Sequence, residues 1–191
     1  MWWVELLNSI VSVLDSGGAG GAAGSYESIA TISGSGVSTI TFSSIPSTYK
    51  HLQIRAMALL SDGSNLAMRF NGDTASNYVM HYLMGNGVNA SASSSGGAAA
   101  QISNVCMTNN STTYPGVSIM DIIDYASTTK NKTLRHFTGT EDNNTIGYQS
   151  IRLGSGLWMN TSAITSITIF NTSSTNGGTN TVFSLYGIKG A

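Results

Sequence analysis

Charge is what this sequence lacks most. Only 9% of its 191 residues are Asp, Glu, Lys or Arg, about a third of the usual share. The 8 basic residues are scattered, and the formal net charge is −1. Nucleic-acid binding depends on clustered Lys and Arg, so nucleic acid is not expected as a main partner. Low net charge also means little self-repulsion, which allows copies to pack densely and weakly favours an assembly component.

Cysteine and proline are scarce too. The single cysteine, Cys106, excludes an internal disulfide and a multi-cysteine zinc site, and we expect it to be a small buried hydrophobe. There are 2 prolines against 22 glycines, and 41% of the residues are hydrophobic. Disordered chains combine few apolar residues with high net charge. The composition therefore predicts a β-rich, turn-rich globular protein with a hydroxyl and amide surface.

Catalytic motifs are missing. The sequence has no nucleophile elbow, phosphate loop, dinucleotide fingerprint or His-x-x-x-His pair. A strand would place Asp121 and Asp124 on opposite faces, which is poor for a carboxylate pair. Glu141–Asn144 offers oxygens to calcium but lacks a spaced ligand series, so a solvated turn is expected. His81 has no serine or aspartate tied to it by the sequence. We expect no enzyme activity, no metal and no cofactor.

The clearest positive signal is a strand at 51–60. Apolar residues occupy every second position there, namely Leu52, Ile54, Ala56, Ala58 and Leu60. This alternation is typical of a half-buried β-strand because successive side chains point to opposite faces. His51, Gln53 and Arg55 face the other way, and a solvated or inter-subunit face is expected for Lys50, His51 and Arg55. Pro46 predicts a turn just before the strand.

Further short strands follow from similar runs between Gly, Asn and Asp clusters. They are Tyr26–Ser33, Ser38–Ser43, Lys50–Leu60, Asn65–Asn71, Tyr78–Met84, Gln101–Thr108, Gly116–Tyr125, Lys132–Thr140, Thr145–Leu153, Ala163–Asn171 and Thr181–Lys189. Without amphipathic helices between them, they predict a β-sandwich or barrel. Ala90–Ala100 is of low complexity and is expected to be a mobile surface loop.

The N-terminal segment Met1–Leu14 is apolar. Its hydrophobic residues fit helical spacing, with a strand through Ile10–Leu14 as the competing interpretation. It lacks a basic start and contains Glu5, which is unlike a signal peptide, and it is too short to span a bilayer. Gly17–Gly24 is typical of a flexible linker.

The sequence thus divides into 1–24, an arm with a Gly-rich linker, and 25–191, a β-sandwich domain. We expect the arm to bind a partner protein, because two adjacent exposed tryptophans are a solubility liability. Folding of the arm back onto its own domain is the alternative. The partner-binding residues of the arm would be Trp2, Trp3, Leu6, Leu7, Ile10, Val11 and Leu14.

Several stretches together resemble a widespread group of tailed-phage virion structural proteins. They are Ser25–Thr31, Phe42–Arg55, Arg69–Asn77 with His81 and Gly85-Asn86-Gly87, Ile122–Arg135, Ser155–Phe170 and Phe183–Gly190. They are spread over 25–191 in a specific joint order. The resemblance implies a virion protein with a jelly-roll-like β-sandwich, on the capsid surface or a tail appendage, and it implies no catalytic residue.

Our interpretation is a capsid decoration (cement) protein. It would sit outside the head as a trimer, binding the major capsid protein or another virion protein. The alternative is a tail-fibre or receptor-binding module that recognises host-surface glycan, although the sequence has no heptad shaft or stalk. Loops such as Ala90–Ala100 and Glu141–Thr145 would carry specificity in that alternative. Trp158 is its candidate glycan contact, with a core tryptophan as the competing interpretation.

Overall fold

The computed structural model describes residues 24–34, 38–60, 64–95, 97–108, 111, 113–142, 149–173 and 181–190. These residues form β-strands and no helix. In chain order the strands are β1 (Tyr26–Gly34), β2 (Thr39–Phe42), β3 (His51–Ala58), β4 (Leu66–Phe70), β5 (Tyr78–Gly85), β6 (Ala90–Ser94), β7 (Ile102–Cys106), β8 (Gly116–Ile123), β9 (Lys132–Thr140), β10 (Ser150–Trp158), β11 (Ile167–Asn171) and β12 (Thr181–Ile188).

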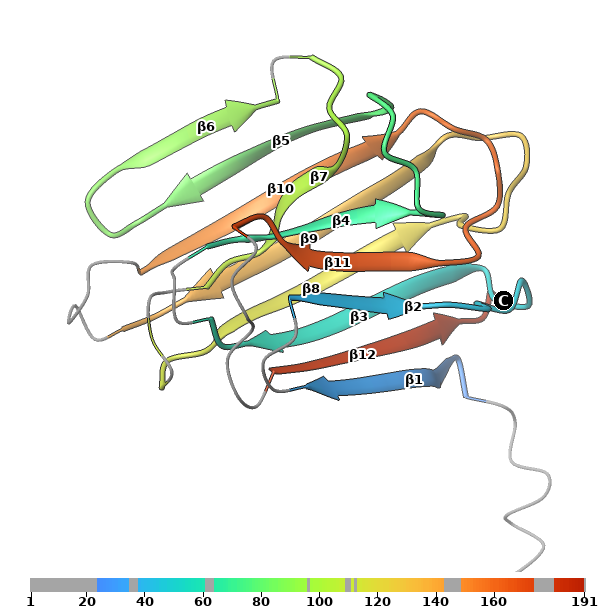
Figure 1. Cartoon of the computed structure of the whole chain (residues 1–191), viewed down its shortest axis with the longest axis horizontal. Coiled ribbons are helices and arrows are strands. Elements are labelled where there is room, and N and C mark those ends of the chain that lie inside the picture. The colour runs from blue at the N-terminus through green and yellow to red at the C-terminus, as the bar shows by residue number, and fades with distance from the viewer. Residues whose placement is uncertain are drawn as a thin grey trace, which may run out of the picture.

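The strands form two antiparallel sheets. The larger has eight strands in the order β1-β12-β3-β8-β9-β10-β5-β6, and the smaller has four in the order β2-β11-β4-β7. Figure 1 shows the small sheet lying over one face of the large one. The predicted all-β sandwich is therefore confirmed, while the jelly-roll connectivity stays a prediction.

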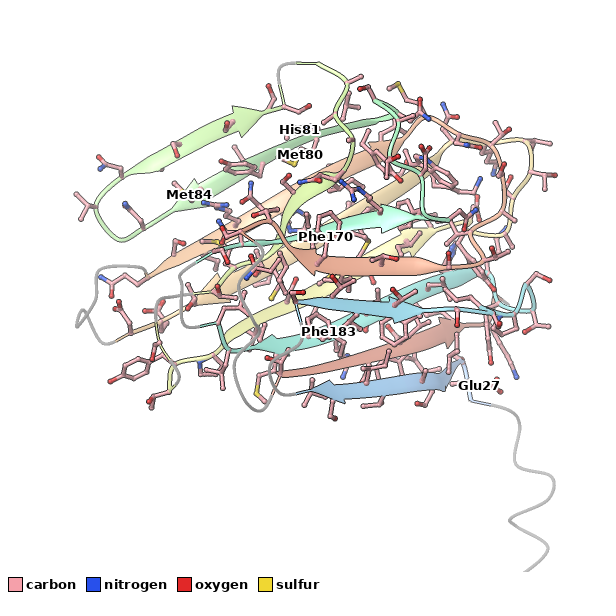
Figure 2. All side chains as sticks on the ribbon, viewed as in Figure 1. Glu27, Met80, His81, Met84, Phe170 and Phe183 are labelled. Atoms are coloured by element: carbon pink, nitrogen blue, oxygen red, sulfur yellow. The ribbon has the colours of Figure 1, made fainter. Side chains whose placement is uncertain are left out.

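The core lies between the two sheets. Strand β3 shows how the sequence builds it: Leu52 and Ile54 are fully buried, and their neighbours Gln53 and Arg55 point to the other face. Phe183 of β12, labelled in Figure 2, is 1% exposed in the same layer. The small sheet contributes Phe70, which is also fully buried. The alternation of the sequence thus places one apolar side of each central strand in the core.

Two expected element boundaries were wrong. Ala90–Ala100 was expected to be a loop, but its first part forms β6, the exposed edge strand beside β5. The strand expected at Thr145–Leu153 continues to Trp158 as β10, through Gly154 and Gly156. A Cβ on Gly154 would lie 2.0 Å from Nε2 of His136, and one on Gly156 would lie 2.7 Å from Cδ1 of Ile102. The absence of a side chain at these two glycines allows close packing under the small sheet, so the glycines lie within the strand and do not end it.

The N-terminal arm lies outside the described residues. This holds for every arm residue expected to bind a partner and for the choice between helix and strand in Met1–Leu14. In the described part of the chain, no helix is long and apolar enough to cross a membrane.

Candidate functional site

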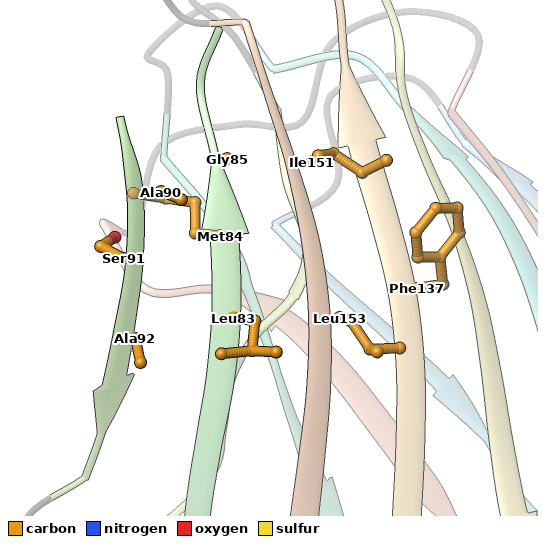
Figure 3. A pocket seen from close by; sticks show the side chains of 9 residues that line it. All are labelled: Leu83, Met84, Gly85, Ala90, Ser91, Ala92, Phe137, Ile151 and Leu153. Atoms are coloured by element: carbon orange, nitrogen blue, oxygen red, sulfur yellow. The ribbon is translucent and has the colours of Figure 1, made fainter. Parts of the chain in front are cut away.

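The outer face of the large sheet, opposite the small sheet, carries large apolar side chains that no described residue covers. Four of them lie side by side on adjacent strands, since Ile119 of β8 pairs with Phe137 of β9, Phe137 with Leu153 of β10, and Leu153 with Leu83 of β5. Leu83 is 62%, Leu153 56% and Phe137 51% exposed. We call these four residues the bulky row. Figure 3 shows Phe137, Leu153 and Leu83 on neighbouring strands.

A second row runs parallel to the first, two residues away on each strand. Val117 of β8 pairs with Gly139 of β9, Gly139 with Ile151 of β10, and Ile151 with Gly85 of β5. We call these four residues the glycine row, because large and absent side chains alternate along it. Met57 of β3 extends it, paired with Val117.

The glycines leave two open hollows in this surface. One, of about 530 Å³, is lined by Leu83, Gly85, Ala92, Ile151 and Leu153. The other, of about 510 Å³, includes Val117, Phe137, Gly139 and Ile151 in its lining. Phe137 and Ile151 line both hollows, so the surface between them is continuous.

Together these positions form what we call the outer face, whose exposed large side chains are Met57, Leu83, Val117, Ile119, Phe137, Ile151 and Leu153. They are between 37% and 62% exposed. With the roughly 200 Å² of a fully exposed aromatic side chain as an upper value for each, they present a surface on the order of 700 Å². The largest apolar patch of a typical monomer is about 300–600 Å², and larger patches mark sites of interaction. The outer face is the candidate functional site.

A polar border limits the outer face on one side. Gln53 of β3 pairs with Tyr186 of β12 and Asp121 of β8, and Asp121 pairs with Arg135 of β9. The Gln53 side-chain amide donates to Oδ1 of Asp121 at 2.8 Å and accepts from Nε of Arg55 at 3.1 Å. These contacts bury Gln53 to 9% exposure. The border is thus ordered by its own hydrogen bonds, whereas the bulky row beside it is left open.

Trp158 is a core residue, which corrects its assignment as a possible glycan contact. It is 1% exposed, and its indole Nε1 donates to Oδ2 of Asp73 at 2.8 Å. Its ring stacks on Tyr78 with 6.3 Å between centroids and 15° between planes. Hydrogen bonds from Asn77 and Trp158 lower the pKa of Asp73. A ring enclosed in this way has no free face for a sugar.

The structure separates the candidate catalytic residues. His81 is exposed on the outer face of β5. Asp121 bonds Gln53, while Asp124 follows β8 and forms ion pairs with Lys130 at 2.8 Å and Lys50 at 3.1 Å. Hydrogen bonds from Lys130 and then Lys50 lower the pKa of Asp124 to about 2. These two carboxylates thus have different partners and are not paired with each other.

The remaining candidate ligands are also not gathered. Cys106 is fully buried, and burial raises the pKa of its thiol to about 12. In the possible calcium turn, Glu141 is exposed and Asp142 is buried, while 143–144 lie outside the described residues. Across the described ranges, no group of three or more His, Cys, Asp or Glu side chains lies close enough to hold a metal ion.

One buried histidine was not singled out in the sequence. His136, on the inner side of β9, is 3% exposed, and Gly154 lies against its ring. Its Nδ1 has no hydrogen-bond partner. Burial, assisted by the charge of Arg152, lowers the pKa of His136 to about 4. The ring is therefore neutral near pH 7 and acts as a packing residue.

The outer face was not found from the sequence, although a signal exists. Strand β8, predicted correctly within Gly116–Tyr125, is apolar on both faces: Val117 and Ile119 point outward, while Met120 and Ile122 are buried. A strand that is half-buried in an antiparallel sheet normally has polar residues on its solvent side. Apolar residues on both sides of β8 therefore indicate a second surface to be covered.

Comparison with known proteins gives no family. No family model and no curated protein match the chain. Among solved structures, the chain is similar to the crystal structure of exo-inulinase from Aspergillus awamori, with a TM-score of 0.36 and 9% identity. The match covers 85% of this chain and 28% of that one. A likeness at this level carries no argument about function.

Proposed function

We propose that this chain is a non-enzymatic structural protein of a phage particle, a capsid decoration protein on the outside of the head. The observation that supports an assembly role is the outer face, an apolar surface on the order of 700 Å² on an otherwise weakly charged protein. The sequence resemblance to virion proteins supports the particle as its location.

The mechanism is burial of surface between neighbours. A decoration protein that contacts several capsid subunits must be detached from all of them before any one can leave, so its binding free energy adds to shell stability. In this proposal the arm Met1–Leu14 anchors the chain to the major capsid protein. The sandwich forms the outer body, and its outer face packs against neighbouring protein. The tail-fibre alternative loses its candidate aromatic glycan contact, because Trp158 is buried.

The test is the copy number of this chain on purified heads. A band intensity comparable to that of the major capsid protein supports decoration, and a small fraction of it indicates a tail component. Deletion of Met1–Leu14 should empty the heads, and unchanged occupancy would contradict the anchoring role of the arm. The matched control is the unmodified chain added back to stripped heads, which should rebind.

A further inference from the structure

The bulky row and the glycine row are related by a simple symmetry. On β9, Phe137 and Gly139 stand two residues apart, and on β5 the same holds for Leu83 and Gly85. Consider a two-fold axis that lies parallel to the rows, midway between them, in the plane just above the sheet. A rotation of 180° about this axis brings a second copy face to face with the first. The bulky row of each copy then lies over the glycine row of its partner. This is the isologous arrangement, in which both partners use the same patch.

Two of the four contacts in this arrangement pair a large side chain with a glycine. Phe137 faces the partner's Gly139, and Leu83 faces the partner's Gly85. The other two contacts, Leu153 with the partner's Ile151 and Ile119 with the partner's Val117, bring two large side chains together, so the two kinds of contact alternate along the rows. Face-to-face antiparallel sheets pack about 10 Å apart with their strands nearly aligned, which is the geometry that this rotation produces.

The two outer glycines are not required by the chain's own packing. A Cβ on Gly139 would lie 3.6 Å from the carbonyl oxygen of Ser150, and one on Gly85 would lie 3.8 Å from Cγ2 of Ile151. Both are ordinary contacts, and neither glycine has a positive φ. The inner glycine Gly154 differs, because a Cβ there would overlap His136 at 2.0 Å. The packing of the domain itself therefore does not require the hollows at the outer face.

Two charged residues, one on β9 and one just after it, are placed symmetrically about the same axis. Arg135 lies two residues before Phe137, and Glu141 lies two residues after Gly139. Both are exposed. The rotation that stacks the rows also places Arg135 opposite the partner's Glu141, twice in each pair. Opposed charges at the rim of an apolar contact fix its register and disfavour slipped arrangements.

The size of the surface also fits a second copy. A standard protein interface buries about 800 Å² on each partner, and the outer face offers on the order of 700 Å² from its seven large side chains. From these four observations we propose that the occupant of the outer face is a second copy of this chain, in a two-fold, face-to-face dimer. This inference rests on the proposed function in one respect, namely that the outer face is an assembly surface. It adds the identity of the partner that binds the outer face. A three-fold contact elsewhere on the chain is compatible with it.

The first experiment measures the mass of the purified full-length chain by analytical ultracentrifugation over a range of concentrations. The wild type should dimerise. Gly139→Leu fills the hollow that receives Phe137 and should weaken dimerisation by on the order of 100-fold, as loss of a central contact does. The folded monomer should not be destabilised, because a Cβ at this position makes only ordinary contacts with Ser150 and Ile151. The matched control is Thr133→Leu, which adds the same side chain to the same strand and face, outside both rows, and should dimerise normally.

The second experiment is a charge exchange. Arg135→Glu and Glu141→Arg should each weaken the dimer by roughly tenfold, and the double variant should restore it, because only the double variant again opposes unlike charges. Restoration requires that positions 135 and 141 meet across the interface. Additive weakening in the double variant would overturn the proposed geometry.

Solution mass and head occupancy, measured together on Gly139→Leu, distinguish this inference from the proposed function. A wild type that stays monomeric, or a dimer that Gly139→Leu leaves intact, overturns the inference. If head occupancy nevertheless falls with Gly139→Leu, the outer face binds the capsid instead, and the decoration role stands without the dimer. A Gly139→Leu chain that is monomeric in solution and still occupies heads fully supports the dimer and assigns capsid binding to another surface.

Discussion

Acidification should destabilise the protein through His136, which is 3% exposed and whose ring lies against Gly154. Burial, with a contribution from Arg152, lowers its pKa from 6.5 to about 4. The unfolded chain therefore takes up a proton near pH 6.5, while the folded chain resists until about pH 4. The contribution is fully present above the unfolded pKa, is lost as the pH falls from 6.5 to about 4, and changes no further below that.

The shift sets the size of the effect. At 1.36 kcal/mol for each pKa unit, the free energy of unfolding should fall by about 3 kcal/mol across this range from His136 alone. A loss of that size is a large part of the 5–15 kcal/mol that stabilises a typical domain. His136→Leu removes the titration, so its unfolding free energy should depend less steeply on pH, and the wild type should lose about 3 kcal/mol of stability relative to the variant as the solution is acidified.

The assay is urea unfolding of the wild type and His136→Leu at a series of pH values from about 7 to about 4.5, where the linkage predicts the change. Carboxylates also titrate at the acidic end, but they are common to both proteins and cancel in the comparison. Thr133→Leu is the control, since this exposed residue carries no titrating group and the variant should keep the wild-type slope. Parallel pH profiles for wild type and His136→Leu would refute the reasoning.

Three further predictions concern the core. Trp158→Ala should cost about 3–5 kcal/mol in urea unfolding, because it empties a buried indole site and removes one of the hydrogen-bond donors to Asp73; a loss below about 1 kcal/mol would contradict the core assignment. Gly154→Ala should destabilise by about 1–3 kcal/mol through overlap with His136, whereas Gly85→Ala should be nearly neutral in the same measurement. Cys106 should not react with a thiol reagent in the native protein and should react once urea unfolds it, because its thiol is buried with a pKa of about 12; rapid native reaction would show local opening.

The sandwich was predictable where one face of a strand is apolar and the other polar. Strand β3 has this pattern, and the structure buries Leu52 and Ile54 as expected. The pattern fails where tertiary packing decides. Gly154 is required by the ring of His136 on the neighbouring strand, a contact that no local window contains. Lys132 is fully buried, with Nζ donating to the carbonyl oxygens of Lys130 and Thr161, which the preference of lysine for the surface does not predict.

The two rows of the outer face could not be predicted from any single strand. They run across four strands that are distant in sequence, and they exist only once the register of β8, β9, β10 and β5 is known. Strand β9 also misleads, because its outward Phe137 is more hydrophobic than its inward neighbours His136 and Thr138. At these three positions, a hydrophobicity pattern alone would predict that the wrong face of β9 is buried.

The strand order of the large sheet also controls when the protein can fold. Strand β12 lies between β1 and β3, so β1 has no partner in the sheet until β12 has been synthesised. A nascent chain that lacks 181–190 leaves both neighbouring edges unpaired and prone to aggregation. Completion of the large sheet must therefore await translation of β12, and such long-range pairing is slow. Prematurely terminated chains cannot complete the large sheet, so only copies whose synthesis has passed β12 would be available for assembly.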